Sequence, residues 1–311
     1  MDRPLVSVVI PTWNRRALLR EAIESVRAQT RADWELVIVD DGSTDGTVAM
    51  VHALGDPRVK LVECEHSGRK SRLRNLGIAA SSGEFVGFLD SDDVWLPNKL
   101  EVQLDALRRD GADWCYGDYA HMDEHGTPVP MRGGFFPPAD GQMVFRALGG
   151  DILKSLLKEE TAAYIGTIIA RRTLIDQVGG FDEAFNMIED LDLGFRLAAA
   201  AKASATPQCV ARVREHSGRI LRTYADVREE AAVIYGGVAN RATDPELRAM
   251  AQDMQAQLWV GVALRCLGRV QILKAASCLL KARQAGASMS AVALRLARAA
   301  GRRLGPQVAF D

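Results

Sequence analysis

Three acids in four positions, Asp90, Asp92 and Asp93, directly follow the apolar run Phe85–Leu89. Carboxylates this close repel one another and resist burial unless a cation lies among them. The apolar run is typical of a strand buried on both faces of a parallel sheet, and α/β sheets bind ligands at the carboxyl ends of their strands. The pattern predicts one wall of a divalent-metal site. The alternative is a solvated acidic turn that caps the helix after it.

A second group of acids, Glu189, Asp190 and Asp192, begins a segment that suits a helix. A carboxylate in the first turn of a helix can satisfy free backbone N–H groups and the helix dipole. It can also accept a proton from a hydroxyl group that attacks a substrate. The residue types alone leave both roles open.

The elements around these acids alternate between strand and helix. A helix with Leu19, Ile23 and Val26 on one face follows the first strand, and the basic segment Arg69–Asn75 opens a later helix. This order predicts an α/β fold with a doubly wound, mostly parallel sheet flanked by helices. The first four predicted strands are Leu5–Ile10, Leu36–Val39, Val59–Val62 and Phe85–Leu89.

Three of these strand ends should meet at one edge of the sheet, because parallel strands present their carboxyl ends together. They carry Pro11 and Thr12, Asp40 and Asp41, and the acids that begin at Asp90. The edge therefore combines carboxylates with hydroxyl and backbone groups.

Composition excludes several classes of protein. The 311 residues can bury a large core and suggest one sizeable domain with an appendage or two domains, and the formal charge of −1 argues against nucleic-acid binding. The five cysteines include no CxxC pair, which fits reduced thiols in a cytosolic protein. No uncharged apolar run approaches the roughly 18 residues that span a bilayer, and the first residues lead into a strand rather than a signal peptide. We expect a soluble or peripheral protein.

Six motifs in order, over roughly residues 4 to 220, resemble the family 2 glycosyltransferases, which have the GT-A fold. They are Val8–Arg15, Val39–Asp45, Arg74–Gly77, Leu89–Asp93, Gly179–Glu183 and Glu189–Asp192. The resemblance implies transfer of a sugar, with inversion, from a nucleotide diphosphate donor to a carbohydrate or lipid-linked acceptor. Family analogy also suggests synthesis of a surface polysaccharide or glycolipid.

The resemblance also implies a role for particular residues. Asp41 would accept the imide N–H of the base, for which UDP is favoured and GDP and dTDP are alternatives. Arg74 would lie near the base or diphosphate; otherwise it is a solvated helix arginine for which Arg69, Lys70 or Arg72 could substitute. The full set expected at the nucleotide-sugar is Pro11, Thr12, Asn14, Asp41, Arg74, Asp90 and Ser91.

For metal and catalysis, the resemblance makes Asp90-Ser91-Asp92 a DXD motif that binds Mg²⁺ or Mn²⁺, with His216 as a further ligand or else a structural histidine. Asp190 would be the general base, and Glu189 would orient the base or the acceptor. Asp182 would contact the acceptor or simply form its turn.

Two domains are predicted, a catalytic domain at 1–222 and a helical extension at 223–311. In Ser290–Leu304, alanines and leucines share one helical face and Arg295, Arg298 and Arg302 the opposite one. Such a helix can lie on an anionic membrane surface, or can pack on the catalytic domain or on a second subunit. The sequence predicts a cytoplasmic protein. Peripheral contact with the inner face of the membrane is compatible with this location.

Two rival functions use similar residues. A sugar-phosphate nucleotidyltransferase needs a glycine-rich, basic phosphate loop after the first strand, where Pro11-Thr12-Trp13-Asn14 stands instead. A non-catalytic nucleotide-sugar binder would not need both acid groups. The sequence therefore favours a glycosyltransferase.

Overall fold

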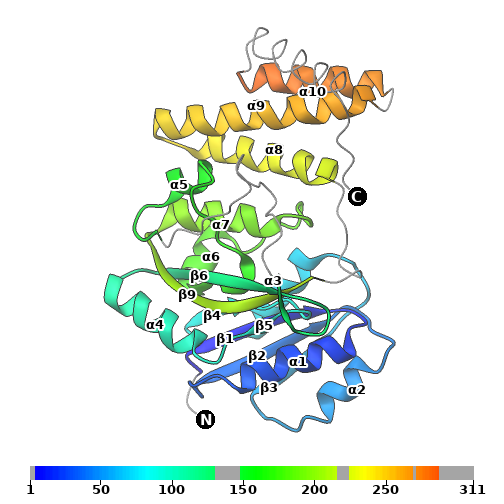
Figure 1. The fold of residues 1–311 in the computed structure, drawn as a ribbon, viewed down its shortest axis with the longest axis vertical. Coiled ribbons are helices and arrows are strands. Elements are labelled where there is room, and N and C mark those ends of the chain that lie inside the picture. Colours follow the sequence, from blue (N-terminus) through cyan, green and yellow to red (C-terminus); the bar gives the residue numbers. More distant parts are fainter. Residues whose placement is uncertain (1–3, 130–147, 216–223, 269–270, 287–311) are drawn as a thin grey trace. The chain divides into compact units, whose positions relative to one another are not determined.

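The computed structural model describes residues 4–129, 148–215, 224–268 and 271–286. The chain divides into two compact units, Met1–Ile220 and Leu221–Asp311, which are described separately (Figure 1). The boundary predicted at residue 222 falls between described segments.

The first unit is built on a nine-stranded sheet with the order β3-β2-β1-β4-β8-β6-β9-β5, and β7 pairs with β6. The first four strands in this order are parallel, whereas β8 runs antiparallel to both β4 and β6. The predicted α/β fold is confirmed, and its sheet is mixed: the described strands form four parallel and four antiparallel pairs. The strands are β1 Val6–Thr12, β2 Trp34–Asp40, β3 Val59–Glu63, β4 Phe85–Phe88, β5 Val94–Trp95, β6 Trp114–Met122, β7 Pro128–Val129, β8 Ile169–Arg171 and β9 Ala203–Arg214.

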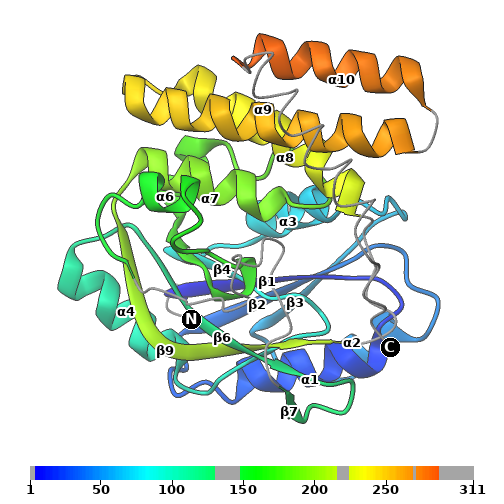
Figure 2. The same cartoon turned by 45° about the horizontal axis from the view of Figure 1, so that its top comes forward.

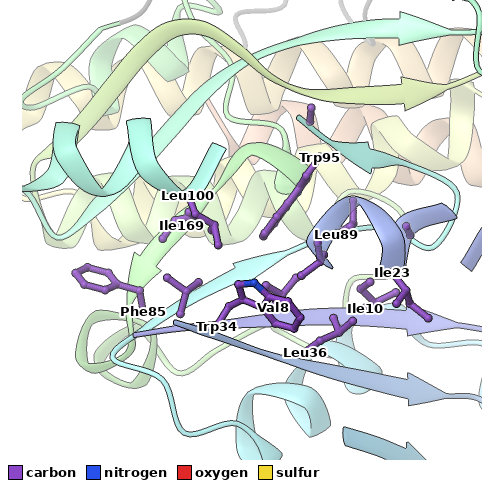
Figure 3. Packing of buried hydrophobic residues seen from close by; sticks show 14 of the residues in the cluster. Val8, Ile10, Ile23, Trp34, Leu36, Phe85, Leu89, Trp95, Leu100 and Ile169 are labelled. Atoms are coloured by element: carbon purple, nitrogen blue, oxygen red, sulfur yellow. The ribbon is translucent and has the colours of Figure 1, made fainter. Parts of the chain in front are cut away.

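Helices cover both faces of this sheet (Figure 2). Side chains of β1 such as Val8 and Ile10 pack with Leu19 and Ile23 of α1 in the main core, where Trp34 also lies (Figure 3). The opposite face of β1 and β2 is covered by α3. The helices are α1 Arg16–Arg27, α2 Thr47–His52, α3 Lys70–Ala80, α4 Lys99–Asp110, α5 Leu153–Leu157, α6 Arg172–Val178 and α7 Glu189–Ala200.

The helix α3 lies unusually close to the sheet. A Cβ atom at Gly77 would come within 2.3 Å of the Val9 side chain, so only glycine allows this approach. Arg74 precedes Gly77 by about one turn and is therefore held near the ends of β1 and β4.

The stretch from Tyr164 to Ala170 does not form a single strand. A 3₁₀ turn, Ile165–Thr167, precedes β8. Side chains take the carbonyl groups that a sheet ladder would use: the Trp95 indole N–H donates to Gly166 O at 2.9 Å, and Lys99 Nζ donates to Thr167 O at 3.0 Å. These long-range hydrogen bonds stabilise the turn.

The second unit contains α8 Tyr224–Arg241, α9 Pro245–Gly268 and α10 Ile272–Gln284, and α9 packs against both of the others. Lys274 of α10 pairs with Glu229 of α8 at 2.6 Å. None of the helices in the described segments is long and apolar enough to cross a membrane. The basic segment Ser290–Leu304 lies outside the described residues, so its membrane or subunit contact stays a prediction.

Candidate active site

The carboxyl ends of β1, β2 and β4 lie side by side in the structure. Thr12 is in register with Asp40, and the Leu89 N–H donates to Val9 O at 3.0 Å, so Asp90 follows directly beside the end of β1. Two buried oxygens at this edge, Thr12 Oγ1 and Asp40 Oδ1, have no hydrogen-bond partner among the described residues. Unpartnered buried acceptors are rare, and a ligand could satisfy these.

The acids after β4 form a compact cluster. Asp90, Asp92 and Asp93 each offer a carboxylate oxygen, and these atoms lie within 4.8 Å of one another. The Asp93 carboxylate is hydrogen-bonded within the protein: it accepts the Tyr164 O–H at 2.6 Å and the Arg214 backbone N–H at 2.9 Å. Burial, followed by the charges of Asp92 and Asp90, raises its pKa.

Asp90 and Asp92 are the members of the cluster that suit a hard divalent cation, which prefers carboxylate oxygens. Their side chains remain 17% and 14% exposed. Arg15, which belongs to the first motif, donates to Asp92, a contact that could not be predicted from the sequence. Burial alone would raise the pKa of Asp90, but the charges of Lys70 and Arg74 outweigh it and hold that pKa well below its ordinary value.

Arg74 lies inside the protein rather than at the surface of the site. Its side chain is 1% exposed; Nη2 donates to Asp90 Oδ1 at 2.6 Å and Nη1 donates to Glu189. The two acid groups of the sequence, at the end of β4 and the start of α7, are thus joined through one guanidinium. Its burial favours a role other than nucleotide contact.

Asp41, the predicted partner of the base, is buried beneath the loop that precedes α3. It accepts the N–H and O–H groups of Ser67 at 2.8 and 2.9 Å and the N–H of Gly68 at 2.8 Å. The ring of His66 stacks on the exposed ring of Trp13 with 4.3 Å between centroids. A contact between Asp41 and a base stays a prediction, and in this structure the carboxylate holds the loop.

The other residues predicted at the nucleotide-sugar lie along the same edge. Pro11 is buried at the end of β1, and Ser91 is buried between Asp90 and Asp92. Asn14 adopts a left-handed backbone with φ of 49°, and its Oδ1 accepts the Thr44 N–H at 2.7 Å. Asn14 therefore joins the loops that follow β1 and β2.

The acids of α7 have different environments, as their first-turn position allows. Glu189 is 4% exposed and is paired with Arg74, and Asp192 is paired with Arg196 at 2.5 Å. Asp190 is only partly buried, and its Oδ1 accepts the Leu191 N–H at 2.9 Å. Of the three, Asp190 is the least buried.

Asp182, the predicted acceptor contact, stands apart from this arrangement. Asp182 is exposed, and its Oδ1 accepts the Ala184 N–H at 2.9 Å, which is the turn-forming role. His216 lies outside the described residues, so its role as a metal ligand stays a prediction.

The family model for glycosyl transferase family 2 matches residues 7–179. The chain belongs to glycosyltransferase family 2. This confirms the resemblance drawn from the motifs and disfavours the nucleotidyltransferase alternative. The first four motifs, from Val8–Arg15 to Leu89–Asp93, fall within the matched range, whereas the start of α7 lies outside it.

Relatives and solved structures agree with this membership. The chain is 40% identical over 119 residues to the Escherichia coli UDP-Glc:alpha-D-GlcNAc-diphosphoundecaprenol beta-1,3-glucosyltransferase WfgD, a match covering 38% of this chain and 47% of WfgD. The chain spans about half the length of the first curated relatives that it matches.

Two solved structures share the GT-A fold. S. aureus TarS 1–349 in complex with UDP-GlcNAc superposes with a TM-score of 0.70 at 18% identity, over 98% of this chain and 93% of that one. The mannosyltransferase PcManGT from Pyrobaculum calidifontis, in complex with GDP-Man and Mn²⁺, gives 0.59 at 22% identity, over 97% of this chain and 81% of that one. At these identities the likeness shows the fold alone.

Proposed function

We propose that this family 2 glycosyltransferase transfers a sugar from a nucleotide diphosphate donor, with UDP as the nucleotide, to a hydroxyl acceptor, with inversion at the anomeric carbon. The observation that carries the proposal is the meeting of two acid groups at one sheet edge, Asp90 with Asp92 and Glu189 with Asp190. The first group suits a donor diphosphate with its cation, and the second suits proton removal from an acceptor.

Names of related proteins support the donor class and the setting. WfgD is named as a UDP-glucose transferase acting on a diphosphoundecaprenol-linked sugar, and the TarS structure holds UDP-GlcNAc. We infer a UDP-sugar donor and a carbohydrate or lipid-linked acceptor in surface polysaccharide synthesis. A cytoplasmic enzyme working at the inner face of the membrane would meet such an acceptor.

The residues after β4 fit a divalent cation, since they combine clustered carboxylate oxygens with partial exposure. Asp92 and Asp90 would hold Mg²⁺ or Mn²⁺, the latter being present in the PcManGT complex. When bound, the cation would neutralise charge on the diphosphate leaving group. Asp93 would keep the cluster in place through Tyr164 and the Arg214 backbone.

The reaction itself requires one proton transfer. The acceptor oxygen forms a bond to the anomeric carbon while the bond from that carbon to the diphosphate oxygen breaks, and its electron pair leaves with the nucleotide. Asp190 takes the proton of the acceptor hydroxyl as the new bond forms. Attack from the face opposite the leaving group inverts the configuration.

A thermal-shift screen tests the donor class. At equal concentrations, UDP with Mn²⁺ should raise the melting temperature more than GDP or dTDP, because the nucleotide with the lowest Kd stabilises the folded protein most. A ligand at about 100 times its Kd contributes about 2.7 kcal/mol to the free energy of unfolding. Mn²⁺ alone and UDP alone are the controls, and each should give a smaller shift than the pair. A donor-hydrolysis assay then separates an enzyme from a non-catalytic binder, because a binder would be stabilised by UDP-sugar without releasing UDP.

A further inference from the structure

Arg74 has no assigned step in the proposed transfer reaction. Its guanidinium is 1% exposed and lies between two carboxylates from distant parts of the chain, Asp90 and Glu189. A guanidinium presents a rigid fork of donors, so it can hold two carboxylates in fixed directions where a lysine would hold one. Arg74 Nε and Glu189 Oε2 are buried and have no hydrogen-bond partner among the described residues.

Because Arg74 is enclosed by other side chains, a more exposed basic residue is better placed to contact the nucleotide. The guanidinium lies 5.3 Å from the centroid of the Phe181 ring, which packs edge-on against Phe88. Lys70, one turn earlier on α3, is partly exposed and makes no ion pair among the described residues. A phosphate could reach Lys70 without displacing a buried ion pair.

The same helix also binds the loop that leads into α7. Asn75 Nδ2 donates to Phe181 O and the Phe181 N–H donates to Asn75 Oδ1, each at 2.9 Å. Ser71 donates to the backbone carbonyl of Phe185. The first turns of α3 therefore fix the approach to Glu189 from two sides, by backbone contacts and by the ion pair.

We propose that Arg74 is a positioning residue that fixes the donor-side acid Asp90 and the first turn of α7 relative to each other, and that it does not bind the nucleotide. This inference rests on the proposed function, because it assigns Asp190, next to Glu189, to the chemistry. Without the shared guanidinium, the Asp190 carboxylate would no longer be held in a fixed position relative to the donor.

Steady-state kinetics of Arg74→Lys test this role. The variant keeps the charge but cannot hold both carboxylates, so we expect turnover to fall by roughly 10²-fold, the cost of a misplacement of about 1 Å. The KM for the donor should change little. Lys70→Met should do the reverse and raise the donor KM by roughly tenfold, the worth of one hydrogen bond to a charged group.

Chemical rescue separates positioning from general stability. Millimolar guanidinium should restore part of the turnover of Arg74→Ala in a saturable way. Arg172→Ala is the matched control: Arg172 donates to Gly83 O, Ile78 O and Ser81 Oγ at the other end of α3. That variant should melt earlier yet keep its turnover, and guanidinium should not change it.

Two results would overturn the inference. One is a raised donor KM with unchanged turnover in Arg74→Lys, which would mean direct nucleotide binding. The other comes from a readout that needs no substrate: amide hydrogen exchange in the first turn of α7 should be faster in Arg74→Lys than in wild type and unchanged in Arg172→Ala. Equal exchange rates in Arg74→Lys and wild type would show that Arg74 does not fix the first turn of α7. If wild type turns over no nucleotide-sugar, the proposed function fails, while this exchange result still decides the role of Arg74.

Discussion

Replacing Asp92 by asparagine should abolish sugar transfer and weaken the metal-dependent binding of UDP. A neutral amide is a poorer ligand for a hard cation than a carboxylate, and the cluster would lose one of its two partly exposed carboxylates. Titration calorimetry of UDP, with and without Mn²⁺, measures the binding part, and UDP release from UDP-sugars measures the activity.

The matched control for this substitution is Asp105→Asn. Asp105 is an exposed carboxylate on α4 that pairs only at the surface with Arg108, so the same chemical change there should leave both measurements unchanged. Wild-type turnover of Asp92→Asn in Mn²⁺ would show that the metal site is misplaced.

Replacing Asp190 by asparagine should separate binding from chemistry. Donor affinity should stay nearly unchanged, while turnover falls by roughly 10²–10⁴-fold, the usual contribution of a positioned general base. Calorimetry with UDP and Mn²⁺ checks the affinity, and initial rates at saturating donor check the turnover.

Asp192→Asn provides the comparison within the same helix. Its carboxylate pairs with Arg196, which also donates to Val178 O and Gly180 O, so this variant should lose thermal stability more than turnover. Normal turnover in Asp190→Asn would remove Asp190 from the mechanism. A product with retained anomeric configuration would contradict single displacement.

The sequence predicts the elements and the edge where they meet because these depend on local patterns. The apolar run before Asp90 indicates a buried strand, and β4 is indeed parallel to β1. Its other neighbour, β8, is antiparallel. The apolar run is typical of parallel sheets, but it does not specify which strand pairs on each side. The turn at Ile165–Thr167 depends on Trp95 and Lys99, which are about 70 residues away in the chain.

Contacts between distant segments explain what the sequence could not assign. Arg74 reads as one of several basic residues on a helix, and its burial depends on Glu189, 115 residues later. Asp41 reads as a free carboxylate at a strand end, yet Ser67 and Gly68 of a separate loop cover it. Motif order gives the position of such residues along the chain, whereas their partners follow only from the fold.

Anomalous diffraction from crystals grown with UDP and Mn²⁺ tests the central claim most directly, because it locates the metal and the nucleotide together. We predict one Mn²⁺ peak at the Asp90 and Asp92 carboxylates, with the diphosphate beside it, the base at the edge that holds Thr12 and Asp41, and Arg74 still buried. A manganese peak away from Asp90 and Asp92, or UDP bound elsewhere on the protein, would contradict the account.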